Sequence, residues 1–247
     1  MNKEIDIEIN IIAHNEEVML EYTINWYRKM FKNPKIVLWD NQSTDSTRSI
    51  AKRLNCHDIK EFMTSGMNDL AQSDMKNDAI RNCKSDWCLV IDADEECLIT
   101  EEDLLNADFN MVQFQGWNIF NKVSSPWESN FEGILDNGYS KTILIKTSEI
   151  KSATLSPGAH SISNIIPKEG FNLRYSIKKY KLVHMKHWSL EWNINRSKYL
   201  ASRQSESNLK NKHSFHFAFS EDIHTNYFND CYNRREPLID KRLELLK

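Results

Sequence analysis

Apolar residues in the first hundred positions form short runs, separated by polar turns and by longer amphipathic stretches. Residues 5–13 begin as isoleucines alternating with polar residues and end as a continuous apolar run, which predicts a strand that becomes buried along its length. From Val18 the apolar positions recur every fourth residue as far as Met30, a spacing typical of an amphipathic helix. The chain is therefore expected to open with a strand followed by a helix.

The same alternation of strand and helix continues along the chain. Short apolar runs at residues 36–39 and 87–91 predict buried strands, and residues 57–62 predict a weaker strand between them. Residues 50–54 and 70–83 carry the apolar spacing of helices. Strands that alternate with helices over short linkers are typical of βαβ units. We expect an α/β fold with a Rossmann-like, mainly parallel central sheet that helices flank.

The pattern is less regular in the second half of the chain. Strands are expected at residues 111–120 and 141–146, where apolar positions cluster or alternate. Residues 124–139 and 153–170 are rich in turn residues and predict long loops, which in compact domains often serve as binding loops or lids.

Helices are expected at the C-terminal end, from Trp188 to about Leu209, over residues 215–232, and from Pro237 onwards. The chain shows no internal repeat or low-complexity linker. We therefore expect one domain followed by a C-terminal helical extension. The expected boundaries are residues 1–188 for the domain, with halves at 1–100 and 101–188, and residues 189–247 for the extension.

Composition and charge exclude several classes of protein. The 247 residues are 40% hydrophobic and 27% charged, which is ordinary for a globular chain. A formal charge of -3, from 32 basic and 35 acidic residues, provides no field that would attract nucleic acid. No stretch approaches the roughly 18 consecutive apolar residues of a membrane span, and the first residues lack the apolar core of a signal peptide. The five cysteines have no metal-finger spacing, so we expect reduced thiols in a cytoplasmic protein.

Polar clusters follow the three clearest predicted strands. Because ligands of parallel sheets bind outside the carboxyl ends of the strands, we expect these clusters to share one rim. Asp92 and Asp94 are spaced i and i+2, which in an extended chain points both side chains the same way, and carboxylate oxygens suit Mg²⁺ or Mn²⁺. An isolated Asp-x-Asp is more often a solvated turn, but three polar strand ends together favour a site. The clusters are Ala13-His14-Asn15-Glu16, Asp40-Asn41 and Asp92-Ala93-Asp94.

Taken in order, these motifs resemble glycosyltransferase family 2 and its relatives of the GT-A fold, which use nucleotide-sugar donors. The motifs that carry the resemblance are residues 12–16, 40–45, 76–77 and 91–95. The resemblance implies a metal-dependent glycosyltransferase that moves a sugar from a nucleotide diphosphate to a hydroxyl on a glycan, a lipid-linked sugar or a protein. It also implies that the first half of the domain binds the nucleotide and the second half the acceptor.

The resemblance assigns residues to the donor and to the metal. Asp92 and Asp94 are expected to bind Mn²⁺ or Mg²⁺, with His184 as the first choice for a third ligand and His187 as the reserve. A UDP-sugar is the expected donor, although Asn41 stands where relatives commonly carry a second Asp. The residues expected to contact the donor are Ala13, His14, Asn15, Glu16, Asp40, Asn41, Lys76, Asn77, Asp92, Ala93 and His160.

An inverting transfer needs a base that takes the proton from the acceptor hydroxyl. The acids of the predicted loop at residues 124–139 are the candidates, with Glu128 first and Glu132 and Asp136 behind it. Trp127 could stack on a sugar face. A retaining transfer needs no such base, and both outcomes stay open, although we favour inversion.

Two other functions remain as alternatives. A sugar nucleotidyltransferase also uses a parallel sheet and an acidic metal site, but it usually needs a glycine-rich loop after the first strand, where this chain has none. A non-catalytic module of the same fold would bind a carbohydrate or a nucleotide without turnover. The aromatic C-terminal helices could also form a homodimer.

Overall fold

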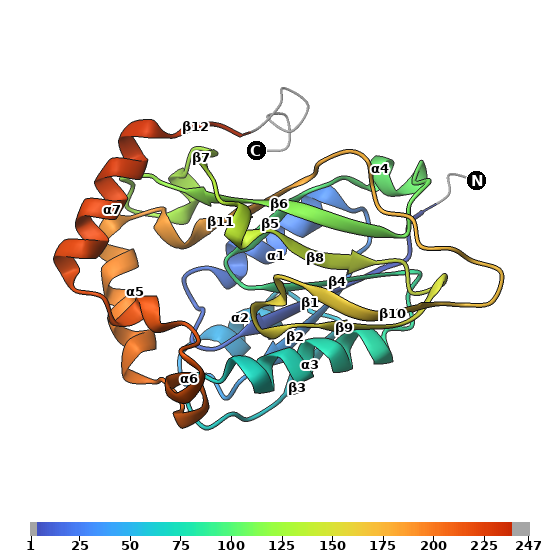
Figure 1. Cartoon of the computed structure of the whole chain (residues 1–247), viewed down its shortest axis with the longest axis horizontal. Coiled ribbons are helices and arrows are strands. Elements are labelled where there is room, and N and C mark those ends of the chain that lie inside the picture. The colour runs from blue at the N-terminus through green and yellow to red at the C-terminus, as the bar shows by residue number, and fades with distance from the viewer. Residues whose placement is uncertain (1–3, 239–247) are drawn as a thin grey trace.

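The computed structural model describes residues 4–238, and helices flank a central ten-stranded sheet in this part of the chain (Figure 1). Strands β4, β1, β2 and β3 lie side by side in that order and run parallel. The predicted α/β fold, with strands and helices in alternation, is confirmed. The first elements are β1 (Ile7–Ala13), α1 (Leu20–Met30), β2 (Lys35–Asp40), α2 (Thr47–Arg53), β3 (Asp58–Glu61), α3 (Asp69–Asn82) and β4 (Trp87–Asp92).

Burial of both faces explains the composition of the parallel strands. Ile9 and Ile11 of β1 and Leu89 and Val90 of β4 have no exposed surface, because helices cover the sheet and leave these strands no solvated face. Helix α1 turns an apolar side toward the same core, where Leu20 is fully buried.

Antiparallel strands extend the sheet beyond β4. Strand β8 lies antiparallel between β4 and β6. Strand β11 pairs with β5 in the antiparallel sense and with β6 in the parallel sense. The elements of this half are β5 (Glu95–Leu98), α4 (Glu101–Leu105), β6 (Met111–Ile119), β7 (Glu132–Leu135), β8 (Lys141–Ile145), β11 (Lys181–His184) and β12 (Glu236–Pro237).

Both predicted long loops contain strands, so the loop predictions were wrong there. Residues 124–139 include β7 between the short helices η1 (Pro126–Glu128) and η2 (Asn137–Tyr139). Residues 150–167 form a hairpin of β9 (Ile150–Leu155) and β10 (Ile162–Pro167). Pro157 and Gly158 lie in the hairpin connection, η3 (Pro157–Ala159), whereas Pro167 is the last residue of β10.

The predicted C-terminal helices form one side of the molecule, coloured orange to red in Figure 1. The expected single helix after Trp188 divides into two, and a strand, β12, contains Pro237, where a helix was expected. The remainder of that last predicted helix lies outside the described residues. The elements are η4 (Met185–His187), α5 (Leu190–Ser202), α6 (Glu206–Asn211), η5 (Phe215–Ala218) and α7 (Glu221–Arg234).

Within residues 4–238, none of the helices combines the length and the apolar character needed to cross a bilayer. The five cysteines are all free thiols, as their spacing predicted.

Candidate active site

The register of the parallel strands brings the three polar clusters to one rim. Ala13 at the end of β1 lies opposite Asp40 of β2, and Ile12 lies opposite Asp92 of β4. Beyond the strands, the backbone N–H of Asn41 donates to the carbonyl of Ala13 at 2.9 Å. The expectation that the polar strand ends meet is therefore confirmed.

A cavity of about 220 Å³ lies at this rim, and elements from both halves of the chain line it. Helices α3 and α5, the turn after β4, the η3 turn and the end of β11 contribute its walls. The predicted site residues that line it are Ala13, His14, Glu16, Asn41, Lys76, Asp92, Ala93, Asp94, His160 and His184. The predicted residues that do not line it are Asn15, Asp40, Asn77, Glu128, Glu132, Asp136 and His187.

Asp92 is the partly exposed member of an ion cluster whose two lysines are buried. The Nζ of Lys76 on α3 lies 2.8 Å from one oxygen of Asp92, and the Nζ of Lys141 on β8 lies 3.1 Å from the other. Lys141 also pairs with the buried Glu95, which accepts a hydrogen bond from the Tyr139 hydroxyl. Burial acts to raise the pKa of Asp92, but the two lysines outweigh it and hold that pKa below its usual range. Asp92 is therefore an ionised partner of two lysines.

Asp94 lies in the turn between β4 and β5, so the extended geometry expected from Asp92 to Asp94 was wrong. Its Oδ2 lies 3.3 Å from Nε2 of His184, at the end of β11. Burial raises and His184 lowers the pKa of Asp94, and the net shift is downward. The ring of Tyr139 stacks on His184 with 4.1 Å between ring centres. Asp94 and His184 thus face each other at the cavity wall.

Hydrogen bonds behind His184 determine which of its nitrogens carries the proton. Asn118 on β6 donates from its Nδ2 to the carboxylate of Asp136 at 2.8 Å, so its Oδ1 is turned toward the histidine. That oxygen lies 2.9 Å from Nδ1 of His184, and only an N–H can donate to it. A neutral His184 therefore carries its proton on Nδ1 and turns the lone pair of Nε2 toward Asp94.

Nε2 of His184 and Oδ2 of Asp94 turn lone pairs toward each other at 3.3 Å. Because two lone pairs repel, this arrangement needs a positive charge between the two atoms. A proton meets this need, and so does a divalent cation, because an imidazole nitrogen and a carboxylate oxygen suit Mn²⁺. Among the described residues no group of three or more His, Cys, Asp or Glu is placed to hold a metal. These two residues therefore fit a partial site, in which water and substrate phosphates supply the remaining ligands.

The other two proposed metal ligands do not fit that site. Both oxygens of Asp92 accept from lysine ammonium groups. His187 is buried against the ring of Phe120, with 4.6 Å between ring centres, and does not line the cavity. Burial lowers the pKa of His187 well below its usual range, so it is a neutral packing residue in this arrangement.

The ends of β1 and β2 form a second wall of the cavity. Nδ1 of His14 donates to the backbone oxygen of Asn41 at 2.6 Å, and its Nε2 accepts from the hydroxyl of Tyr199 on α5 at 2.8 Å. Asn15, with a φ of 52°, donates to the same hydroxyl at 2.8 Å. The side chain of Asn41 exchanges two hydrogen bonds with Thr64. This wall is preorganised by contacts with α5.

Several predicted donor contacts have structural partners instead. Asn77 exchanges two hydrogen bonds with the backbone of Leu155, at 3.2 and 2.7 Å, and so ties α3 to β9. Asp40 is fully buried and accepts from the backbone of Ser43 at 3.1 Å. Glu16 does line the cavity, but it is paired with Arg196 of α5.

His160 enters the cavity from the turn after β9. Gly158, two residues earlier, has a φ of 71°, and a Cβ at this position would lie 2.6 Å from the imidazole ring. Only glycine gives the ring that space without strain. Burial lowers the pKa of His160, with Lys141 contributing in the same direction, which favours the neutral ring.

The three acids proposed as the catalytic base lie outside the cavity. The carboxylate of Glu128 accepts from the Ser124 hydroxyl at 3.0 Å, Glu132 pairs with Arg235 at 2.8 Å, and Asp136 holds Asn118. The contacts of Asp136 and Glu132 tie their part of the loop to β6 and to Arg235, the residue after α7. Trp127 lies edge-on to Tyr22 and keeps about half of its surface exposed.

Several basic and aromatic residues of the cavity lining escaped the sequence analysis. Each is a basic or aromatic residue, and a single residue of this kind carries no motif. One signal was available on α5, where spacings of three, four and seven residues put side chains on one helix face, and Arg196, Tyr199 and Arg203 have such spacings. These residues are Tyr139, Lys141, Lys186, Arg196, Arg203, His216 and Phe217.

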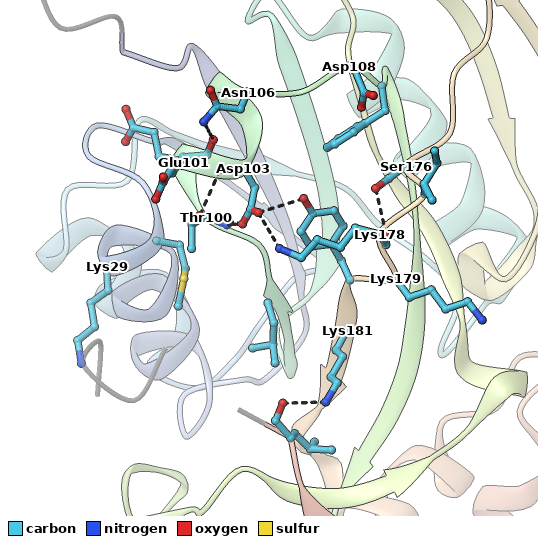
Figure 2. A pocket seen from close by; sticks show the side chains of 17 residues that line it. Lys29, Thr100, Glu101, Asp103, Asn106, Asp108, Ser176, Lys178, Lys179 and Lys181 are labelled. Carbon is cyan, nitrogen blue, oxygen red and sulfur yellow. Dashed lines mark hydrogen bonds and ion pairs between the residues drawn. The ribbon is translucent and has the colours of Figure 1, made fainter. Parts of the chain in front are cut away.

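A larger cavity, of about 670 Å³, lies beside α4 and the start of β11 (Figure 2). Some of its polar side chains have partners within the chain: Lys178 and the Tyr180 hydroxyl both contact Asp103, and Lys181 donates to the backbone of Leu238. It contains none of the residues expected at the site. We therefore assign the candidate active site to the smaller cavity at the strand ends.

Comparisons with known proteins agree with the sequence motifs. Residues 8–105 match the family model described as Glycosyl transferase family 2. An uncharacterized glycosyltransferase of Rickettsia typhi is 32% identical over 112 residues, which are 44% of this chain and 36% of that protein. The chain thus spans about a third of the length of this curated relative. The resemblance to glycosyltransferase family 2 is confirmed over residues 8–105.

Two solved structures show the range of structural likeness. S. aureus TarS 1-349 in complex with UDP-GlcNAc has a TM-score of 0.48 and 16% identity, over 86% of this chain and 71% of that chain. Glucosyl-3-phosphoglycerate synthase from Mycobacterium tuberculosis, in complex with Mn²⁺, UDP and glucosyl-3-phosphoglycerate, has a TM-score of 0.34 and 16% identity, over 46% of this chain and 44% of that chain.

Proposed function

We propose that this protein, whose residues 8–105 match glycosyl transferase family 2, transfers a sugar from a nucleotide-diphosphate donor to a hydroxyl acceptor. The observation that carries the proposal is the facing pair of Asp94 and His184 in a cavity at the carboxyl ends of β1, β2 and β4. Ligands of open α/β sheets bind at this edge, and the pair fits a cation that would bridge to a diphosphate.

We assign the residues of the cavity different roles according to their positions. His14 and Asn41, at the ends of β1 and β2, would hold the nucleoside part of the donor. Asp94 and His184 would hold Mn²⁺ or Mg²⁺, which neutralises charge on a departing diphosphate. The ion cluster of Lys76 and Lys141 keeps Asp92 ionised and fixes the turn that carries Asp94.

UDP-sugars are the donors that we propose. Two structures with a weak likeness to this chain hold UDP or UDP-GlcNAc, and the motif after β2 resembles the nucleotide-contacting segment of family 2. The side chain of Asn41 is engaged by Thr64, so recognition of the base would use the backbone at this position or the ring of His14. The acceptor we propose is a hydroxyl of a glycan, a lipid-linked sugar or a protein.

Inversion is the stereochemical course that we propose, and Glu128 remains the first candidate for its base. Its carboxylate is held by Ser124 outside the cavity, so it would have to approach the acceptor when substrate binds. Catalytic loops often move in this way. Replacing Glu128 with Gln, and assaying transfer and donor binding separately, tests this assignment: a transfer rate equal to that of the wild type excludes Glu128 as the base.

Turnover of a UDP-sugar panel tests the proposed activity. We expect UDP release that depends on Mn²⁺ or Mg²⁺ in the wild-type protein, and a loss of about 100-fold or more in Asp94→Asn, because oxygen and nitrogen ligands to a catalytic ion are rarely replaceable. Asp78→Asn is the matched control, since Asp78 is exposed and its side chain pairs with Arg81 alone among the described residues.

The outcomes separate the alternatives. UDP binding without any release of UDP from a sugar donor would favour a non-catalytic module. Full activity of Asp94→Asn would contradict the placement of the metal and diphosphate.

A further inference from the structure

Lys186 is a buried lysine for which the described residues provide no acidic partner. It belongs to η4, between His184 and His187, and 8% of its surface is exposed. Its Nζ lies 4.1 Å from the centre of the Phe217 ring, and within residues 4–238 it makes neither a hydrogen bond nor an ion pair. Because a buried ammonium group without a counter-charge is strongly disfavoured, this position is suited to an anion that comes from outside the chain.

The other buried cations of the cavity are already neutralised. Lys76 and Lys141 hold Asp92, and Arg196 holds Glu16. Arg203 also lines the cavity without a carboxylate partner among the described residues, but its side chain is only half-buried and lies over the ring of Tyr199. Water can hydrate Arg203. Lys186 is therefore the buried cation whose charge the described part of the chain leaves uncompensated.

The surroundings of Lys186 do not supply the missing charge. Among the described residues, Asp94 is the acid whose charge acts on Lys186, and Asp94 is already in contact with His184. The other titratable groups whose charge interacts with that of Lys186 are histidines, His187, His216 and His224. A lysine among histidines, facing a cavity that Asp94 also lines, forms a basic end of that cavity.

We propose that Lys186 binds an anionic oxygen group of a substrate, a phosphate or a carboxylate, at the end of the cavity between Asp94 and Phe217. This inference deepens the proposed function and rests on it for the presence of a substrate in this cavity. The anionic group has two sources, the diphosphate of the donor or an acidic group on the acceptor. In both cases a charge-assisted hydrogen bond from the ammonium to oxygen is the shared chemistry.

Calorimetric titration with inorganic pyrophosphate tests the proposal. In Lys186→Met we expect the Kd for pyrophosphate to rise by about 10- to 100-fold, the value of one charge-assisted hydrogen bond. The melting temperature of this variant should equal or exceed that of the wild type, because an uncompensated buried charge is replaced by an apolar side chain of similar length. Lys186→Arg retains the charge and should restore affinity to within a few-fold of the wild type.

Lys210→Met is the matched control, since Lys210 is exposed on α6 and lies away from the cavity. Repeating the titration with saturating UDP distinguishes the sources of the anion. If UDP blocks the Lys186-dependent binding of pyrophosphate, the anion is the diphosphate of the donor. If pyrophosphate still binds beside UDP, the anion belongs to the acceptor.

An affinity in Lys186→Met equal to that of Lys210→Met would overturn the inference, as would a wild-type protein that binds no pyrophosphate. The proposed function is judged separately, by the release of UDP from a sugar donor. Unchanged turnover in Lys186→Met together with unchanged pyrophosphate binding removes the role of Lys186 and leaves the activity standing. Lys186-dependent binding of pyrophosphate without turnover of any donor keeps the anion site at Lys186 and removes the proposed activity.

Discussion

Asp92 holds two buried lysines together, and its removal isolates one of them. Lys141 keeps Glu95 as a partner, whereas Lys76 has no other carboxylate within the described residues. Breaking a buried ion pair from one side costs about 3–5 kcal/mol, because the remaining charge is left without a partner. We therefore expect Asp92→Ala to lower the free energy of unfolding by about 3 kcal/mol in urea denaturation, by the same principle.

The exposed pair of Asp78 and Arg81 provides the comparison. Asp78→Ala should change the free energy of unfolding by less than about 1 kcal/mol, as exposed ion pairs usually do. If Asp92→Ala and Asp78→Ala lower the free energy of unfolding by the same amount, the ion cluster of Asp92, Lys76 and Lys141 does not stabilise the fold. Losses of activity in Asp92 variants must therefore be corrected for the fraction of folded protein.

The proton of His184 gives a second prediction at the residue scale. Nitrogen-15 NMR of the neutral ring should show the proton on Nδ1, because Asn118 offers it an oxygen that Asp136 holds in place. In Asn118→Ala the acceptor is gone, and we expect the Nε2–H form to become populated. A wild-type ring with its proton on Nε2 would contradict this account of the hydrogen-bond chain.

Sequence analysis could identify some residues of the site but not others. Asp94 and His184 each follow a recognisable strand, so their positions at a strand end were predictable. Lys141 and Lys186 could not be found, because whether a single lysine is buried depends on which elements pack around it. The pairing of Asp92 with two lysines likewise joins residues 16 and 49 positions apart in the chain.

At the scale of elements, Glu149, the residue before β9, joins three segments. Its carboxylate accepts from Arg174 at 2.6 Å and Asn110 at 3.1 Å, and it pairs with Lys146. Burial raises its pKa, but these donors outweigh burial and hold that pKa below its usual value of 4.5. Because the folded pKa is the lower one, the stabilisation is present above pH 4.5 and is lost as the pH falls through the folded pKa.

Glu149→Gln should therefore destabilise the protein by about 2–3 kcal/mol at pH 7, the order expected for a charge-assisted contact that loses its charge. The difference from the wild type should shrink as the pH falls below 4.5 in urea denaturation. Glu169→Gln, at an exposed position just after β10, serves as the control. A difference between Glu149→Gln and the wild type that does not depend on pH would contradict the assignment.

The strands and helices of the first half were predictable because burial on both faces leaves continuous apolar runs, as in β4. The hairpin of β9 and β10 was not. Strand β10 keeps residues such as Ser163 and Ile166 exposed and ends at Pro167, so its sequence lacks the apolar run of a buried strand. The contacts of α3 with β9, through Asn77 and Leu155, arise only in the folded chain.

At the scale of the molecule, the cavity is made by segments from both ends of the chain. The region that matches the family model ends at residue 105, yet Lys141, His184, Lys186 and Arg196 line the cavity as well. Helix α5 contacts the end of β1 through Tyr199 and His14. The division into a domain at residues 1–188 and an extension at 189–247 stays a prediction. Residues of the predicted extension, such as Arg196, form part of the cavity wall.

The position of UDP in a crystal grown with UDP and Mn²⁺ tests the central claim most directly. We expect the uracil and ribose beside His14 and Asn41, and the diphosphate beside Asp94 and His184, in the cavity at the ends of β1, β2 and β4. UDP seated instead in the larger cavity beside Asp103 and Lys178, with the strand ends unoccupied, would contradict the account.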